Sequence, residues 1–397
     1  MLAEVLIQIK YTGERQAKNR GMGKAVNKDK EDHTDTLFNR LHRDVGHVLG
    51  YPATKILDFS SLYRFLEFPI NNIGDPFSST GYFRLNTHDV ERDVIQWFAK
   101  ILNARKLHHE DDSVWGYVTC GGTEGNMYGL YLARELLPDG MVYYSGDTHY
   151  SVAKILRIAN IRSTMVKSRA DGEMDYDDLA AALKRNHGVP PIIFANIGTT
   201  MRGAIDDIDT VKERLRDAAI TRYYIHADAA LSGMILPFVD KPQPFDFRAG
   251  IDSISISGHK FPGMPMPCGV VLARRSLVDR VAQNVEYIGT KDTTILGSRN
   301  GVTPIFLHHL IQTVGEDGFR AMVQNCFNVA DYAIRKFSSK NINAWRHRNS
   351  ITVVFPRINE PVLQKWQIAL QGTDAHLITM PHITTKVIDE FIDELSA

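Results

Sequence analysis

The middle of the chain alternates short, continuously apolar runs with segments whose apolar residues recur every three or four positions. The first pattern is typical of buried strands and the second of helices that cover a sheet. Strands are expected at 115–119, 141–145, 191–196, 222–227 and 251–257. Helices are expected between them at 127–137, 152–158, 176–184 and 209–218. This alternation predicts a mostly parallel sheet with helices on both faces.

The two ends of the chain follow other patterns. Residues 10–33 are rich in Lys, Gly, Asn and Asp and have almost no apolar periodicity, which indicates a mobile leader. Helical spacing begins near Thr34 and stops at Gly50-Tyr51-Pro52. After about Asn300 we expect helices at 304–314 and 318–336, a strand at 351–355, a helix, a strand at 375–380 and a last helix at 386–395. The expected organisation is a leader (1–33), an N-terminal helical segment (34–75), a large domain (76–299) and a small C-terminal α/β domain (300–397).

Composition and charge narrow the function classes. Of the 397 residues, 44% are hydrophobic and 23% are charged, which is typical of a globular protein with a sizeable core. Lys+Arg and Asp+Glu both number 46, so the formal net charge is zero and no nucleic-acid partner is expected. The apolar runs are too short to span a bilayer, and the first residues lack the basic start and cleavage site of a signal peptide. Neither membrane insertion nor secretion is therefore expected.

The three cysteines, Cys120, Cys268 and Cys326, are far apart and form no CxxC pair, so neither a disulfide framework nor a zinc site is expected. The compartment that fits this usage is the reducing cytosol. Cys120 stands beside a glycine-rich loop, where a catalytic thiol is one interpretation. A small buried residue is the simpler one.

Candidate chemistry lies where ligands bind to parallel sheets, beyond the carboxyl ends of the strands. The first motif there is Gly121-Gly122-Thr123-Glu124-Gly125-Asn126, between a strand and a helix. Glycines let the backbone approach an anion, and the N–H groups that open a helix favour a phosphate. The motif is neither a Walker loop nor a dinucleotide fingerprint, and a plain strand-to-helix turn would explain it equally well.

The second motif, His226-Ala227-Asp228-Ala229-Ala230, ends an apolar strand. An ionised Asp228 buried there needs a cation to offset its desolvation. A protonated pyridine nitrogen is such a cation, and the small Ala230 leaves room for a flat ring. The alternative is a structural Asp that caps the following loop. His226 and Asp228 also suggest a metal pair, but no third ligand stands at metal spacing, so no metal is expected.

The third motif, Ser255-Ile256-Ser257-Gly258-His259-Lys260, places a lysine just past a buried strand. Burial lowers the pKa of an amine and makes it a nucleophile toward a carbonyl group. The apolar strand and the small Ser and Gly argue against the alternative of a surface lysine. Ser257 and His259 are able to donate hydrogen bonds to a phosphate.

The fourth motif, Asp147-Thr148-His149-Tyr150-Ser151, follows another strand. An imidazole at that strand end can stack flat on a pyridine ring, although a structural histidine is the alternative. The joint order of the motifs resembles that of pyridoxal 5′-phosphate (PLP) enzymes with the aspartate aminotransferase-type fold, fold type I. Among these, the sequence is similar to the group II PLP-dependent amino acid decarboxylases, and within them to bacterial histidine decarboxylases and plant serine decarboxylases.

The resemblance runs from about Asp35 to the C-terminus. The matching stretches are 115–119, 147–155, 192–200, 226–240, 297–301 and 343–356. It implies an α/β fold with a mostly parallel, seven-stranded-type sheet between helices, a small C-terminal α/β domain, and PLP bound in the large domain. It also implies PLP-dependent α-decarboxylation of an L-amino acid.

Individual roles come from the same resemblance. Lys260 would bind the cofactor covalently, and Asp228 would pair with its pyridinium nitrogen. His149 and Ala230 would lie on the two faces of the ring, with Thr200 near its phenolic oxygen. The residues expected to hold the phosphate are Gly121, Gly122, Thr123, Ser257 and His259.

The resemblance extends to the substrate side. The residues similar to the segment that lines the family's substrate-carboxylate pocket are Asn71, Asn72, Asp75 and Pro76. Tyr287 matches a tyrosine on a mobile loop that returns a proton to the substrate carbon, and His149 is a second proton-donor candidate. The loop through 292–294 is similar to one that reaches the neighbouring subunit's active site, so a homodimer is implied.

The expected reaction is L-histidine to histamine and CO2. Serine or another small or aliphatic L-amino acid is the alternative, because some positions match the serine branch instead. These are 75–77, Asp-Pro-Phe where the histidine enzymes carry Asp-Trp, and 261–267, 284–287 and 380–382. Transamination, alone or coupled to decarboxylation, would use the same cofactor residues and is a second alternative. A PLP-binding protein without activity is disfavoured by the presence of both Lys260 and Tyr287.

Overall fold

The computed structural model describes residues 28–54, 56–78, 81–104 and 113–396. The chain divides into two compact units, one up to His47 and one from Val48 onward. In the first, helix α1 (Lys28–Asp44) leads into a 3-10 helix, η1 (Val45–His47). Of the expected leader, residues 1–27 lie outside the described residues, and residues 28–33 belong to α1.

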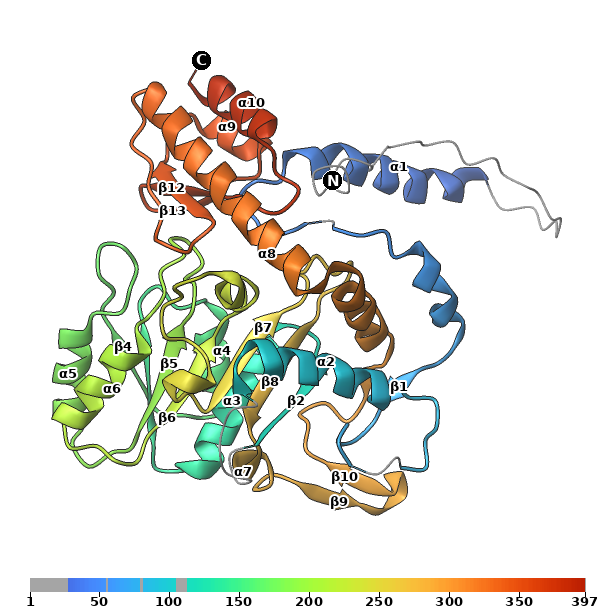
Figure 1. The fold of residues 1–397 in the computed structure, drawn as a ribbon, viewed down its shortest axis with the longest axis vertical. Helices are drawn as coiled ribbons and strands as arrows, with labels where there is room; N and C mark the ends of the chain where they lie inside the picture. The colour runs from blue at the N-terminus through green and yellow to red at the C-terminus, as the bar shows by residue number, and fades with distance from the viewer. Residues whose placement is uncertain (1–27, 55, 79–80, 105–112, 397) are drawn as a thin grey trace. The chain divides into compact units, whose positions relative to one another are not determined.

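A seven-stranded sheet forms the centre of the second unit, with the order β2-β8-β7-β6-β5-β3-β4 (Figure 1). Its strands are β2 (Val114–Thr119), β3 (Met141–Ser145), β4 (Ser163–Val166), β5 (Pro191–Asn196), β6 (Tyr224–Asp228), β7 (Ser253–Ser257) and β8 (Gly269–Arg274). Strands β3 to β7 pair in parallel, whereas β8 is antiparallel to both β7 and β2. The expected fold class is therefore confirmed, although β4 and β8 were not among the expected strands.

Helices cover both faces of this sheet. They are α2 (His88–Ile101), α3 (Gly122–Leu136), α4 (Ser151–Ile158), α5 (Tyr176–Arg185), α6 (Ile208–Asp217) and the short α7 (Arg275–Val278). Successive residues of a strand point to opposite faces. In β5, Ile192 and Phe194 accordingly pack in the core that includes α3 and α4, and Ile193 and Ala195 in the core that includes α2, α5 and α6.

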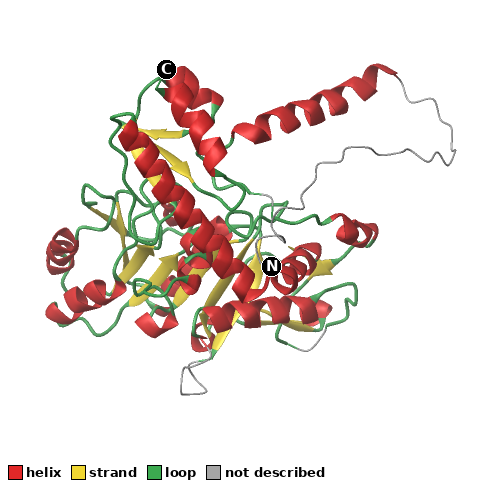
Figure 2. Ribbon diagram, turned by 45° about the horizontal axis from the view of Figure 1, so that its top comes forward, coloured by secondary structure: helices red, strands yellow, loops and turns green. Residues whose placement is uncertain are grey.

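The C-terminal part begins with α8 (Val302–Ser339), which bends at Gly315, where φ is 64°. The two expected helices correspond to the two arms of this helix. A small antiparallel sheet follows, in the order β12-β14-β13, and lies beside α8 and α10 (Figure 2). The remaining elements are β12 (Thr352–Pro356), α9 (Glu360–Lys365), β13 (Ala369–Gln371), β14 (Asp374–Ile378) and α10 (Thr385–Leu395).

Short elements connect these parts. Strand β1 (Asn71–Asn72) pairs with β11 (Arg299–Asn300), and β9 (Gln283–Val285) pairs with β10 (Thr290–Asp292). The short 3-10 helices are η2 (Ser60–Glu67), η5 (Ser232–Met234), η6 (Leu236–Phe238), η7 (Phe247–Ala249) and η8 (Glu286–Ile288). Within the described ranges, no helix combines the length and apolar character that crossing a membrane requires.

Candidate active site

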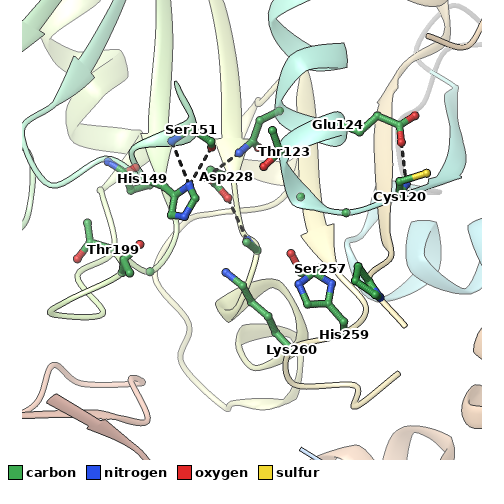
Figure 3. A pocket seen from close by; sticks show the side chains of 18 residues that line it. Cys120, Thr123, Glu124, His149, Ser151, Thr199, Asp228, Ser257, His259 and Lys260 are labelled. Atoms are coloured by element: carbon green, nitrogen blue, oxygen red, sulfur yellow. Dashed lines mark hydrogen bonds between the residues drawn. The ribbon is translucent and has the colours of Figure 1, made fainter. Parts of the chain in front are cut away.

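A cavity of about 400 Å³ opens at the carboxyl ends of the parallel strands (Figure 3). Every residue expected to hold a cofactor lines it: Gly121, Gly122, Thr123, His149, Thr200, Asp228, Ala230, Ser257, His259 and Lys260. The lining also includes residues to which the sequence assigned no role, among them Glu124, Asn126 and Asn196. The four motifs, far apart in the chain, therefore meet at one site.

The glycine-rich loop is shaped for close approach to an anion. Gly121 has φ 150°, a conformation that favours glycine, and a Cβ at Gly122 would lie 2.8 Å from the Ser257 Oγ. Helix α3 begins at Gly122, so its first N–H groups have no partner within the helix. The Glu124 carboxylate stabilises the loop. It accepts hydrogen bonds from the Cys120 N–H at 2.7 Å and from the Tyr117 hydroxyl at 2.9 Å.

Cys120 corrects one expectation. It is exposed, not buried, and it lines the cavity. Desolvation and the nearby Glu124 carboxylate raise the pKa of its thiol. Because the thiolate is the nucleophilic form, this environment gives the catalytic-thiol interpretation no support.

Asp228 ends β6 and is only 8% exposed. Its Oδ2 accepts a hydrogen bond from Asn126 Nδ2 at 2.8 Å, and its Oδ1 accepts one from the Ala230 N–H at 3.2 Å. Neither partner carries a charge. A buried carboxylate held only by neutral donors needs a cation, and a protonated pyridine nitrogen meets that need. The residues present therefore fit PLP.

Lys260 projects its amine into the cavity, toward His149 and Asp228 (Figure 3). Burial lowers the pKa of this amine, and the Asp228 carboxylate opposes that shift. The lowered pKa increases the neutral fraction, which is the form that attacks a carbonyl carbon.

His149 also lines the cavity, from the loop between β3 and α4. Its Nδ1 accepts a hydrogen bond from the Ser151 N–H at 3.3 Å and lies 2.8 Å from the Ser151 Oγ, which places the ring proton on Nε2. Burial lowers the pKa of His149; Asp228 opposes this shift and Lys260 adds to it. Asn196, at the end of β5, donates to the neighbouring Thr148 Oγ1 at 3.1 Å and so helps to hold this loop.

The residues expected on the substrate side lie elsewhere. Asn72 is fully buried and donates to Glu91 Oε2 at 2.7 Å, and Asp75 Oδ1 accepts from the Trp115 Nε1 at 3.0 Å. Neither these two nor Asn71 and Pro76 are among the residues that line the cavity. Tyr287 is 82% exposed on η8, also outside the lining. Within the described part of one chain, the structure does not bring these five residues to the cofactor residues.

The sequence profile of the pyridoxal-dependent decarboxylase conserved domain matches residues 86–355, well over half of the chain. The chain belongs to the pyridoxal-dependent decarboxylase family. The enzyme is thus a carboxy-lyase with PLP as its cofactor, which confirms both expectations.

Individual relatives of this decarboxylase agree with the family. The histidine decarboxylase of Pseudomonas fluorescens is 51% identical over 352 residues, 88% of this chain and 86% of that protein. The histidine decarboxylase of Acinetobacter baumannii is 49% identical over 368 residues, 92% of this chain and 94% of that protein. The solved structure of L-methionine decarboxylase from Streptomyces sp. 590 superimposes with a TM-score of 0.85 at 26% identity and covers 94% of this chain and 96% of its own.

Proposed function

We propose that this decarboxylase converts L-histidine to histamine and CO2. The observation that carries the proposal is the identity of about one half with histidine decarboxylases, over most of both chains. The change at 75–77, where the sequence is similar to the serine branch, affects three residues, whereas the identity with the histidine decarboxylases is about one half over 88–92% of this chain.

The cofactor side of the proposal uses residues of the cavity. PLP, when bound, supplies an electron sink for the electron pair that stays on the substrate carbon as CO2 leaves. Lys260 offers its amine to the cofactor carbonyl, and Asp228 offsets the charge of the pyridinium nitrogen. The N–H groups that begin α3 bind the phosphate together with Ser257 and His259.

His149 and Ala230 would hold the ring between them in this proposal, and Thr200 would lie near its phenolic oxygen. His149 carries its proton on Nε2, since Nδ1 is occupied by Ser151. The Nε2–H group of the neutral ring is available for a hydrogen bond to the substrate. As a proton donor to the α-carbon, His149 would first have to take up a second proton on Nδ1.

We further propose that the working unit is a homodimer in the cytoplasm, where the free cysteines Cys120, Cys268 and Cys326 stay reduced. Tyr287 is exposed and lies outside the cavity lining of its own chain, and in this proposal it acts as proton donor in the cavity of a second copy. Asn71 and Pro76 are candidates for substrate contact in that assembly. Asn72 and the Oδ1 atom of Asp75 are hydrogen-bonded within their own chain, and in this proposal these two residues hold the segment in place.

The test is a product assay on the purified, PLP-loaded protein with L-histidine, L-serine and L-methionine offered separately. We expect CO2 and histamine in equal amounts, with L-histidine the preferred substrate by kcat/KM. Ethanolamine, or the amine of methionine, as the main product would overturn the substrate assignment. A keto acid without CO2 would overturn decarboxylation itself.

A further inference from the structure

A chain of buried polar side chains lies behind Asp228, on the face of β6 that packs against α3. Asn126 Nδ2 lies 2.8 Å from Asp228 Oδ2, and Asn126 Oδ1 lies 3.0 Å from His226 Nε2. His226 Nδ1 is 2.7 Å from Ser253 Oγ, which is 2.7 Å from the Tyr224 hydroxyl. Tyr224, Ser253 and His226 are fully buried, and none of them lines the cavity.

Chemistry determines the direction of every hydrogen bond in this chain. The Asp228 carboxylate only accepts, so Asn126 must turn its NH2 group toward it and its carbonyl oxygen toward His226. That oxygen needs a donor, so His226 carries a proton on Nε2. Burial lowers the pKa of His226 to about 3, so the ring is neutral and its Nδ1 is an acceptor.

The outer links follow from the inner ones. The Nδ1 acceptor of His226 requires the Ser253 hydroxyl to donate, and the Ser253 oxygen then accepts from the Tyr224 hydroxyl. Burial raises the pKa of Tyr224, which keeps that hydroxyl protonated. All four hydrogen bonds therefore point their protons toward Asp228. Aligned hydrogen bonds of this kind polarise and strengthen one another.

The local sequence provides for this arrangement. Tyr224, His226 and Asp228 alternate along β6 and so share one face of the sheet. A glycine in the middle of α3 admits the imidazole, because a Cβ at Gly129 would lie 2.1 Å from the His226 Nδ1. Glycine in a helix interior costs stability relative to alanine. The helix tolerates that cost at the one position where the histidine ring approaches.

We propose that Asn126 and His226 are positioning residues that keep the Asp228 carboxylate aimed at the pyridinium nitrogen of the cofactor. Their neutral donors stabilise the negative charge without cancelling it, whereas a cationic histidine would compete with the pyridinium for the same carboxylate. The proposal rests on the role of Asp228 in the proposed function. It adds two residues, one of them outside the cavity, to the set that determines cofactor affinity.

The first test reads the His226 tautomer directly. The protein is labelled with ¹⁵N-histidine, with and without PLP, and the His226 signals are assigned by their absence from the His226→Gln spectrum. We expect one neutral ring with its proton on Nε2 between about pH 6 and about pH 8. A ring with its proton on Nδ1, or a doubly protonated ring, would overturn the proposal without any reference to activity.

The second test measures the dissociation constant of PLP in paired variants. Asn126→Ala and His226→Leu remove a donor from the chain, and we expect each to weaken PLP binding about tenfold or more. His226→Gln keeps an N–H group near the position of Nε2 and should recover most of that loss. Tyr224→Phe removes only the outermost donor and should have the smallest effect of the series.

Controls separate positioning from folding. Tyr176→Phe is the match for Tyr224→Phe, because Tyr176 is also buried and donates to Glu173 at 2.6 Å outside the cavity lining. It should leave PLP affinity unchanged. Equal affinities of the Leu and Gln variants at His226 would contradict the proposal. If Asp228→Asn leaves PLP affinity intact, the role of Asp228 itself is wrong; if Asp228→Asn weakens binding and Asn126→Ala does not, only the present inference fails.

Discussion

The cofactor half and the substrate half of the expected active site differ in how the chain builds them. The cofactor half comes from the ends of neighbouring strands in one sheet, and a single chain assembles all of it around the cavity. The expected substrate half lies on the β1–β11 pair and on the η8 turn between β9 and β10. Those segments do not line the cavity.

This difference follows from burial. Strand ends in a seven-stranded sheet are fixed by the core on both faces, so motifs at those ends must converge. Asn72 belongs to a separate buried network that also includes Glu91 and its ion-pair partner Arg299. Tyr287 has almost no support from its own chain, being 82% exposed. One chain completes the cofactor half of the site but not the expected substrate half. This is the arrangement expected of a single subunit if two subunits share the site.

The largest effect is expected at the centre of the cofactor half. Lys260→Ala removes the amine that we propose bonds to the cofactor, and we expect decarboxylation to fall by at least about a thousandfold. The absorbance of the covalently bound cofactor should disappear with it. Lys386→Ala, an exposed lysine on α10 with an 85% exposed side chain, is the control and should retain both. A Lys260→Ala protein that still binds PLP covalently would show that another amine has this role.

Tyr287→Phe tests the expected substrate half of the site. Removal of the proposed proton donor should lower amine formation about a hundredfold. Part of the product should be diverted to an aldehyde, released by water, with the amino group of the substrate left on the cofactor. PLP affinity should stay within about twofold and stability within about 0.5 kcal/mol, because the side chain is exposed. Product analysis, PLP titration and urea unfolding measure the three quantities. Unchanged amine formation would leave His149 as the proton donor.

Mixing the two variants sharpens the comparison further. If Tyr287 serves the partner's cavity, a dimer of one Lys260→Ala subunit and one Tyr287→Phe subunit carries both defects in one site and none in the other. An equimolar mixture that exchanges subunits should then recover about a quarter of the wild-type activity. If Tyr287 served its own cavity, each site of the mixed dimer would hold one defect. No activity would return in that case.

Asn72→Ala should have a smaller effect, and on stability. It leaves the buried Thr87 N–H and the Glu91 carboxylate without a partner that each has in the wild-type protein. We expect the free energy of unfolding to fall by about 2 kcal/mol, with PLP affinity unchanged. The exposed Asn328→Ala on α8 is the matched control. Full stability combined with a raised KM would instead make Asn72 a substrate contact.

The sequence predicted five of the seven strands and missed β4, at one edge, and β8, which lies between β2 and β7. Strand β5 matches the expected range residue for residue, because its continuous apolar run is buried on both faces. Strand β8 has a similar apolar run, but it is antiparallel and follows β7 without a helix between them, which β–α alternation does not anticipate. Strand β4 is a short edge strand with exposed positions, so it has no apolar run to recognise.

The residues of the site also differ in how far the sequence predicted them. Motif order was sufficient for the residues at strand ends, because their position follows from the topology. Asn126 and Asp228 are 102 residues apart in sequence, and their contact depends on α3 covering β6. Nothing local in either motif reveals it. Cys120 was expected to be buried for its residue type, and its exposure follows from the cavity that opens beside it.

The smallest effect concerns a neutral histidine within the cofactor half. The pKa of His226 is about 3 in the folded protein and about 6.5 when unfolded, so below about pH 6.5 the unfolded chain binds the additional proton. Stability from this group is therefore complete above that pH and is lost as the pH falls through the window toward 3. At about pH 5.5 the loss is about 1.2 kcal/mol relative to pH 7.

His226→Gln removes this titration, so the wild-type protein should lose about 1.2 kcal/mol more than the variant between about pH 7 and about pH 5.5. Urea unfolding at the two pH values measures the difference, and other histidines cancel because both proteins share them. An equal loss in the two proteins would mean that His226 is already charged in the folded state. A cationic histidine would then lie behind Asp228. The proposed alignment of the four hydrogen bonds toward Asp228 would be wrong.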